Sequence, residues 1–318
     1  MPALTTHKIF AEQVLKELNT DLIDINTYYM FAQSHDILFY YKGKDYKLYN
    51  ALGKKAHHKK TKQYITNIIE CIKNNQINDK QCYGYLFGVI THYYLDSTLH
   101  PYIFYKTGVN RNTKDTEKYR GQHNLFERTL DSIIYQRTYN KTYNKCNISK
   151  EIIPKVILNN KLTTLLNFAY SKTYDTKQIS NIIIKGYNTM RLFHNIVVED
   201  KYSVKYNLYK TIDKLSNNQT NCLRSYSTSV SQNQNILNLK NKNWYHPVTN
   251  ELHNESIPEL INIAKIRTIN TIKKIIKYLN NDKNINYKEL IEDIDYSTGL
   301  LIKDNKKMRY FEYWNIFF

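Results

Sequence analysis

The sequence is poor in cysteine and in long apolar runs, and each shortage argues against a class of protein. Its four cysteines are scattered over 318 residues without a Cys-x-x-Cys pair, so a disulfide scaffold is excluded and reduced thiols are expected. No run of eighteen apolar residues occurs, which argues against a membrane-spanning helix. Charged residues in the first twenty positions interrupt any secretory signal segment, so we expect a cytoplasmic protein.

Acidic residues are also scarce. The chain has 28 Asp and Glu against 46 Lys and Arg, which gives a formal net charge of +18. Such a charge favours contact with phosphate-bearing partners, among them lipid head groups and nucleic acid. Lys, Asn, Ile and Tyr are over-used together, as AT-rich coding produces, so base composition explains the charge equally well. The charge alone therefore names no substrate.

Apolar residues recur at helical spacing along the chain and predict an all-α, compact multi-helix fold. The clearest case begins at Thr61, where Ile65, Ile68, Ile69 and Ile72 mark one face of a helix. Further helices are expected over 7–18, 21–33, 81–100, 121–136, 150–170, 176–197, 257–280 and 287–294. Pro101 is expected to end the helix over 81–100. We predict a single domain over 1–318, with a mobile loop near 217–240 and an aromatic segment, 309–318, as the one candidate strand.

Histidines are concentrated in the first part of the chain, at spacings that suit metal ligands. His92, Asp96 and His100 stand four residues apart, so they fall within roughly 80° of one another around a helix. His123 and Glu127 repeat this spacing on the next expected helix, where two side chains one turn apart can bind one ion. In apolar helices the two carboxylates would be costly to bury without compensating cations. The pattern therefore indicates a metal centre.

The alternative interpretation is that these histidines are ordinary residues that bind no metal. A single helical histidine near apolar residues is more often an ordinary core or surface residue, but two such sets on consecutive helices are much less easily accidental. Imidazole and carboxylate ligands without cysteine favour Zn²⁺ at a catalytic site, while composition leaves iron and manganese open. Eight candidate ligands exceed one tetrahedral site, so more than one ion is expected. These candidates are His7, Asp36, His57, His92, Asp96, His100, His123 and Glu127.

Five segments carry a more specific signal. They are MPALTTH at 1–7, QSHD at 33–36, GKKAHHKKT at 53–61, GVITHYYLDSTLHPY at 88–102 and HNLFE at 123–127. In this order they resemble the zinc-dependent phospholipase C family, in its short bacterial branch without a secretion signal. NWYHP at 243–247 and SIPEL at 256–260 are similar more weakly. The resemblance implies a compact helical domain, with a metal-binding core over 1–135 and helices over 150–318 completing it.

The resemblance also implies a site with three zinc ions. The first ion would be held by Asp36, His57, His92 and Asp96. The second would be held by His100, His123 and Glu127. The third would be held by His7, a bridging Asp96 and the amino terminus, which is Pro2 after removal of Met1, where secreted members have Trp. His57 is preferred to His58 because the family places its ligand immediately before a His/Glu-Lys-Lys-Thr run, which here begins at His58. His35, His58, His194, His246 and His253 are interpreted as ordinary histidines, with His35 the best candidate to support a ligand.

Together these observations predict a zinc-dependent phosphodiester hydrolase in which metal-activated water attacks in line. Asp36 would act as general base or orient the water. A phospholipid is the favoured substrate. A single-strand nuclease of the same superfamily is an alternative, although such nucleases usually close their ligand set with Asp where Glu127 stands here. A zinc-stabilised binding protein without turnover is another. The aromatic tail 308–318 either makes peripheral membrane contact or packs on its own domain, and no protein partner is implied.

Overall fold

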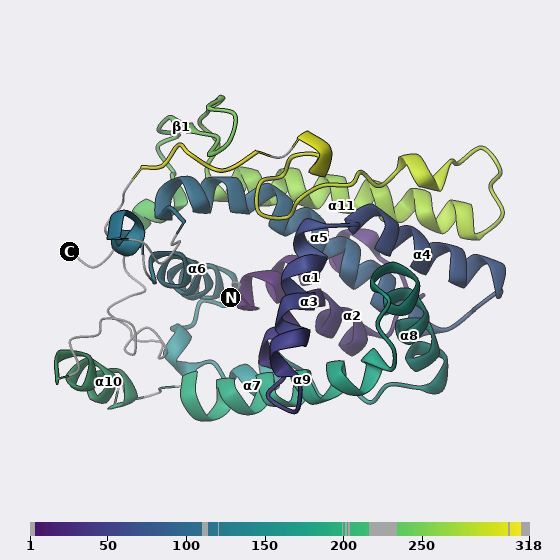
Figure 1. The fold of residues 1–318 in the computed structure, drawn as a ribbon, viewed down its shortest axis with the longest axis horizontal. Coiled ribbons are helices and arrows are strands. Elements are labelled where there is room, and N and C mark those ends of the chain that lie inside the picture. Colours follow the sequence, from purple (N-terminus) through teal and green to yellow (C-terminus); the bar gives the residue numbers. More distant parts are fainter. Residues whose placement is uncertain are drawn as a thin grey trace.

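The computed structural model describes residues 4–109, 114–119, 121–198, 200, 202, 204–215, 234–304 and 306–312. Helices dominate these ranges, so the predicted all-α fold is confirmed (Figure 1). The α-helices are α1 (Leu4–Leu18), α2 (Ile25–Phe31), α3 (Tyr46–His58), α4 (Thr61–Asn74), α5 (Lys80–Thr107), α6 (Gln122–Tyr139), α7 (Ile148–Glu151), α8 (Asn160–Tyr174), α9 (Ile179–Phe193), α10 (Val204–Leu215) and α11 (Ile257–Leu279).

Shorter elements connect these helices. The 3₁₀ helices are η1 (Ser34–Tyr40), η2 (Lys114–Tyr119), η3 (Tyr143–Lys145), η7 (Gln234–Leu237), η8 (Tyr287–Glu289) and η9 (Ile302–Asp304), and η4 (His194–Val198) is a π-helical turn. Strands β1 (Trp244–Tyr245) and β2 (Leu252–His253) pair antiparallel, with Trp244 opposite His253. One hydrophobic core cluster runs from Leu4 to Tyr296 and so includes residues from both halves of the chain.

Helix α5 lies at the centre of the fold. Its first turn is capped by Asp79, whose carboxylate accepts the backbone N–H groups of Gln81 and Cys82, each at 3.0 Å. Helices α1, α2, α4, α6, α8 and α11 all pack against it, and α11 runs beside it in Figure 1. Since α5 carries three of the eight candidate ligands, the helices around it hold these ligands in a fixed frame.

Two glycines let α2 approach α5 closely. A side-chain carbon at Gly88 would lie 2.8 Å from the Cβ of Phe31, and one at Gly84 would lie 2.8 Å from the carbonyl oxygen of Asp24. Any larger residue would push α2 away. His92 follows Gly88 by one turn on the same face of α5. The close approach therefore brings the segment after α2, which carries Asp36, to His92.

The prediction that Pro101 ends its helix is wrong. Helix α5 continues through Pro101 to Thr107. The proline has no N–H group for the carbonyl of Ser97, but residues beyond it, among them Tyr102 and Ile103, are buried in the core. Their burial outweighs one missing hydrogen bond. His100 is therefore helical and keeps its alignment with Asp96.

Four other predictions about elements need correction. Helix α3 was not expected, and His57 and His58 lie in its last turn. The helix expected over 150–170 is replaced by the short α7, an extended stretch and α8, since Asn159 caps a new helix. The range 287–294 holds only η8, and the helix expected over 21–33 is limited to α2.

Residues 309–312 form no strand. Instead Arg309 and Tyr310 donate backbone hydrogen bonds to the carbonyl of Pro247, and Glu312 pairs with Lys106 of α5 at 2.6 Å. This part of the tail packs on its own domain. The rest of the tail, 313–318, and most of the loop predicted near 217–240 lie outside the described residues. Within the described part of the chain, no helix is both long and apolar enough to span a bilayer.

Candidate metal centre

The structure brings all eight predicted ligands into one cluster, drawn from five elements. His7 comes from α1, Asp36 from η1 and His57 from α3. Helix α5 provides His92, Asp96 and His100, and α6 provides His123 and Glu127. The cluster has two parts, the inner group and the outer group. The inner group comprises His7, Asp36, His57, His92 and Asp96. The outer group comprises His100, His123 and Glu127.

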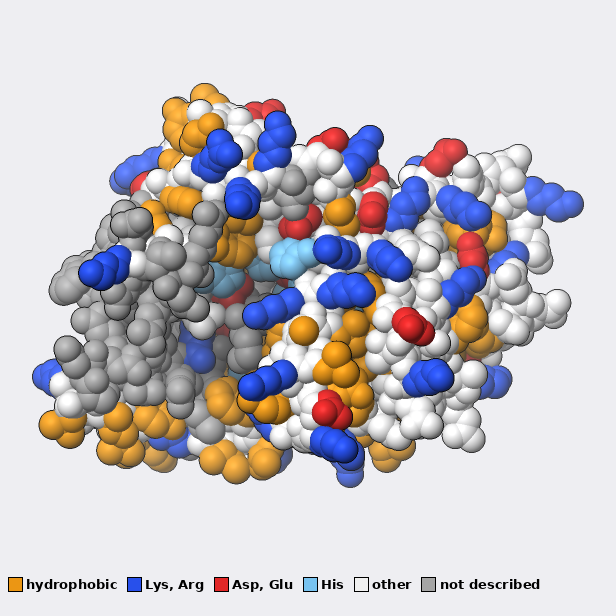
Figure 2. All heavy atoms as spheres, viewed as in Figure 1, with side chains coloured by type: hydrophobic (Ala, Val, Ile, Leu, Met, Phe, Trp, Pro, Cys, Tyr) orange, Lys and Arg blue, Asp and Glu red, His pale blue; other side chains and the backbone are white. Residues whose placement is uncertain are grey.

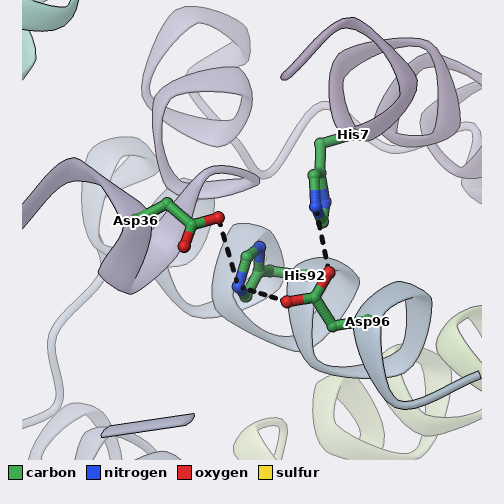
Figure 3. A group of neighbouring side chains, drawn as sticks. All are labelled: His7, Asp36, His92 and Asp96. Carbon is green, nitrogen blue, oxygen red and sulfur yellow. Dashed lines mark ion pairs between the residues drawn. The ribbon is translucent and has the colours of Figure 1, made fainter. Parts of the chain in front are cut away.

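The inner group is buried, and Figure 3 shows four of its members, His7, Asp36, His92 and Asp96. The Nε2 atom of His7 lies 3.0 Å from Asp96 Oδ1, and that of His92 lies 3.2 Å from Asp96 Oδ2. His57 Nε2 lies 3.2 Å from Asp36 Oδ1 and 3.5 Å from His92 Nε2. One ligand atom from each of His7, Asp36, His92 and Asp96 falls within 4.8 Å of the others, so these four can share an ion.

The outer group is more open. The Nε2 atoms of His123 and His100 lie 3.0 Å and 3.4 Å from Oε1 of Glu127. His100 Nε2 also lies 3.9 Å from Asp96 Oδ1, so Asp96 stands between the two groups. The His123 side chain is 24% exposed, whereas that of His92 is 0% exposed. A second ion can therefore lie closer to solvent than the first.

Backbone carbonyls orient three of the imidazoles. The Nδ1–H groups of His57, His92 and His100 donate to the carbonyls of Gly53 at 2.7 Å, Ala32 at 3.1 Å and Tyr296 at 3.1 Å, respectively. Each bond fixes the tautomer in which Nε2 carries a lone pair, and each Nε2 faces the carboxylates. Metal-binding histidines commonly have this arrangement.

A turn far along the chain completes the centre, and no motif in the sequence predicts it. In residues 293–299, named here the C-terminal turn, the carboxylate of Asp295 accepts the N–H groups of Ser297 and Thr298 and the Nδ1–H of His58. The N–H of Tyr296 donates to the carbonyl of His57 at 3.0 Å. The C-terminal turn thus contacts both the α3 histidines and His100.

Helix α1 is anchored by a second buried carboxylate that sequence reasoning missed. Asp131 of α6, one turn after Glu127, accepts the N–H groups of Thr5 and Thr6 at 3.1 and 2.8 Å and the Thr6 hydroxyl at 2.8 Å. Burial raises the pKa of Asp131 to about 6, although these hydrogen bonds act in the opposite direction. The anchor fixes the first turn of α1, and with it the direction of His7.

Charges within the cluster are strongly coupled. Burial acts to raise the pKa of Asp96, but the imidazoles of His92, His100 and His7 hold it well below its ordinary value. Burial acts to lower the pKa of His100, but Asp96 and Glu127 raise it to about 9. The carboxylates thus draw positive charge into a buried site. Cations or imidazolium protons can supply that charge, and binding a metal releases those protons.

The cluster opens into a pocket of about 140 Å³. Figure 2 shows histidine and acidic side chains at the bottom of a hollow on this face. The pocket is lined by Asp36, Phe39, Lys54, His57, His58, Asp96, His100, Phe104, His123, Glu127 and Ser297. A small molecule in the pocket can therefore reach both groups.

The remaining histidines lie outside the cluster. His35 is buried beside the ring of His57, and its Nδ1 atom is hydrogen-bonded to the Tyr170 hydroxyl at 2.8 Å. Burial lowers the pKa of His35. His58 points to Asp295, so the structure places His57 rather than His58 against Asp36. His246 contacts the carbonyl of Thr298. Pro2 lies outside the described residues, which begin at Leu4.

A family model described as zinc dependent phospholipase C matches residues 6–179, more than half of the chain and all eight ligand positions. The chain belongs to the zinc-dependent phospholipase C family. The family thus agrees with the resemblance found in the sequence. Neither the curated proteins nor the solved structures contain a significant match.

The residues present fit the family's metal. Two buried carboxylate oxygens, Asp36 Oδ2 and Asp96 Oδ2, have no hydrogen-bond partner among the described residues, although imidazole nitrogens lie near both. Such atoms are costly to bury alone. Imidazole nitrogen and carboxylate oxygen atoms that converge on common points are the donor set that Zn²⁺ accepts. The chain therefore has the features of a zinc-dependent hydrolase of phosphodiesters.

Proposed function

We propose that this protein is a phospholipase C-like enzyme that cleaves the head group from a phospholipid, with three zinc ions at its candidate metal centre. The observation that carries the proposal is the convergence of the inner and outer groups around Asp96 at the bottom of one pocket. Asp36, His57, His92 and Asp96 of the inner group would hold one ion, the outer group a second, and His7 with Asp96 and the amino terminus a third.

Bound zinc lowers the pKa of coordinated water toward about 7 and neutralises charge on phosphoryl oxygens. The side chains would orient the water and the metal ligands. Asp36 Oδ2, buried and without a hydrogen-bond partner among the described residues, can hold a proton from the attacking water or orient that water. The carbonyls of Gly53, Ala32 and Tyr296 keep the imidazoles in one tautomer throughout.

The openness of the site supports catalysis rather than a purely structural role for zinc. A structural zinc site is usually closed by four protein ligands. Here His57, His100 and His123 line an open pocket, and His123 is partly exposed. An open position beside the ligands leaves room for water and a phosphodiester.

The test is to load the untagged protein with Zn²⁺, measure its zinc content, and incubate it with phospholipid vesicles and with single-stranded DNA. We expect diacylglycerol from the vesicles and no oligonucleotides. Asp36→Asn should retain the outer-group zinc and lose about 10²-fold or more in turnover. Oligonucleotide release without diacylglycerol would instead assign the chain to the nuclease branch. Full zinc occupancy with neither product would leave a zinc-stabilised binding protein.

A further inference from the structure

One wall of the pocket is formed by α3, and it is strongly basic. Residues 42–62, which span α3, its flanking loops and the first two residues of α4, contain eight lysines and a single acidic residue, Asp45. None of these lysines forms an ion pair with any residue in the described part of the chain. In Figure 2, Lys and Arg side chains follow the edge of the hollow beside the histidines. We name this region the α3 wall.

Lys54 is the member of the α3 wall that lines the pocket itself. The inward face of α3 is formed by Leu52, Gly53, Ala56 and His57, which leaves the Lys54 side chain exposed toward the pocket rim. The carboxylates that line the pocket, Asp36, Asp96 and Glu127, all belong to the candidate metal centre. Lys54 is therefore a positive charge that has no ion-pair partner in the described part of the chain, beside the place where a phosphodiester would bind.

Among the described residues, the pocket lining lacks the features that would hold a quaternary ammonium group. Such a group is recognised by open aromatic faces. The two aromatic residues of the lining are already stacked on imidazoles: Phe39 on His57, with ring centroids 5.9 Å apart, and Phe104 on His123, at 4.5 Å. A cationic head group would also meet the positive charge of Lys54, while the carboxylates of the lining, Asp36, Asp96 and Glu127, belong to the candidate metal centre.

Exposed apolar side chains favour a lipid surface over nucleic acid as the source of the anion. At the start of α3, Tyr46 is 42% exposed and Leu48 is 64% exposed, next to Lys44 and Lys47. A helix that combines basic residues with exposed aromatic and aliphatic residues is suited to the boundary of an anionic membrane. A nucleic-acid strand would use the lysines but not Leu48.

We propose that the enzyme acts on phospholipids of net negative charge, with Lys54 selecting the head group and the rest of the α3 wall binding the anionic surface. The proposal rests on the phospholipase activity proposed above and extends it to a substrate class. Vesicles of phosphatidylglycerol represent that class, and vesicles of phosphatidylcholine represent the zwitterionic lipids that it excludes.

The experiment uses the zinc-loaded full chain and two readouts. Sedimentation measures binding to each type of vesicle, and diacylglycerol release measures turnover. We expect tighter binding to phosphatidylglycerol, weakening between about 0.05 M and 0.5 M salt as screening increases. We also expect faster turnover on phosphatidylglycerol.

Variants separate the two roles of the α3 wall. Lys54→Gln should lower the ratio of phosphatidylglycerol to phosphatidylcholine turnover by about threefold to fivefold, the effect of one partly solvated charge. Lys44→Gln with Lys47→Gln should weaken binding to anionic vesicles. Lys274→Gln, an exposed lysine on α11 outside the pocket lining, is the matched control and should change neither quantity.

Each remaining outcome is decisive. Equal binding to both vesicles, or a ratio for Lys54→Gln equal to that for Lys274→Gln, overturns the substrate class while leaving a phospholipase. Faster turnover of phosphatidylcholine overturns it as well. Cleavage of single-stranded DNA with no lipid turnover overturns both this inference and the proposed function. If neither substrate is cleaved, the binding measurement still tests the α3 wall. Binding to phosphatidylglycerol vesicles that is absent, or that does not weaken with salt, shows that the α3 wall does not bind an anionic surface.

Discussion

The inner and outer groups of the candidate metal centre use the same imidazole and carboxylate chemistry in different surroundings. The inner group is buried among α1, η1, α3 and α5. Two of its imidazoles are oriented by backbone carbonyls, His57 by Gly53 and His92 by Ala32. The outer group faces the pocket, and its His100 is oriented by Tyr296. Burial and orientation therefore differ although the ligands do not. The inner group is expected to bind its ion more tightly.

The largest expected effect comes from Asp96, which stands between the two groups. Asp96→Asn removes the charge that faces His7, His92 and His100. We expect loss of zinc from both groups and a fall in turnover of about 10³-fold or more. Metal analysis after dialysis, together with turnover, measures this effect.

Glu127→Gln tests the outer group alone. It should release the outer ion and leave the inner one bound. Glu251→Gln, an exposed carboxylate near the hairpin, is the control for the loss of one charge. Normal zinc content in Asp96→Asn would mean that the two groups do not share this carboxylate.

A smaller effect is expected at the C-terminal turn. Asp295→Ala removes the acceptor for Ser297 and Thr298, so the carbonyl of Tyr296 no longer holds the ring of His100. Loss of such an outer partner typically weakens metal binding by about 10- to 100-fold. We expect this loss in the outer group and a smaller one in the inner group, as measured by titration against a chelator.

Asp295→Asn keeps one acceptor oxygen and should weaken binding less than Asp295→Ala does. Asp304→Ala, in the nearby η9, should have no effect on zinc affinity. Equal losses in both groups would show that the C-terminal turn supports the whole centre rather than its outer half.

The smallest effect concerns stability near η1, the element that carries Asp36. His194 contacts the Tyr40 hydroxyl at 2.9 Å, and burial, aided by Arg128, lowers the pKa of His194 to about 3. The unfolded chain binds this proton with a pKa near 6.5. The stability that neutral His194 contributes is therefore complete above about pH 6.5 and is lost as the pH falls toward 3.

Between those limits, the free energy of unfolding should fall by up to about 1.4 kcal/mol per pH unit from this group alone. Urea denaturation of metal-free protein between pH 7 and pH 4 measures the slope. His194→Gln should reduce it, whereas His253→Gln, on β2, should not. Identical slopes for wild type and His194→Gln would contradict the assignment.

The helices that carry ligands in pairs could be predicted from the sequence, because residues four apart lie on one face of a helix. His92 with Asp96, and His123 with Glu127, needed only this local rule. Helix α3 was missed although Leu52, Ala56 and their neighbours follow the same spacing, because surrounding lysines mask the pattern. The continuation of α5 past Pro101 depends on burial in the folded core, which no local rule contains.

The support of the site could not be predicted because its contacts are distant in sequence. Asp293 caps the start of α4 through Thr61 and Lys62. Asp131 anchors Thr5 and Thr6 from the far end of the metal-binding core. Each carboxylate looks ordinary in the sequence, and only the fold gives it a partner.

The C-terminal turn also has a consequence for biosynthesis. The bond from His100 to Tyr296 spans 196 residues, and that from His58 to Asp295 spans 237. A nascent chain that already contains every ligand side chain still lacks the carbonyl that orients His100. The outer group therefore reaches its final geometry only after residue 296 has left the ribosome, long after its last ligand, Glu127, has done so.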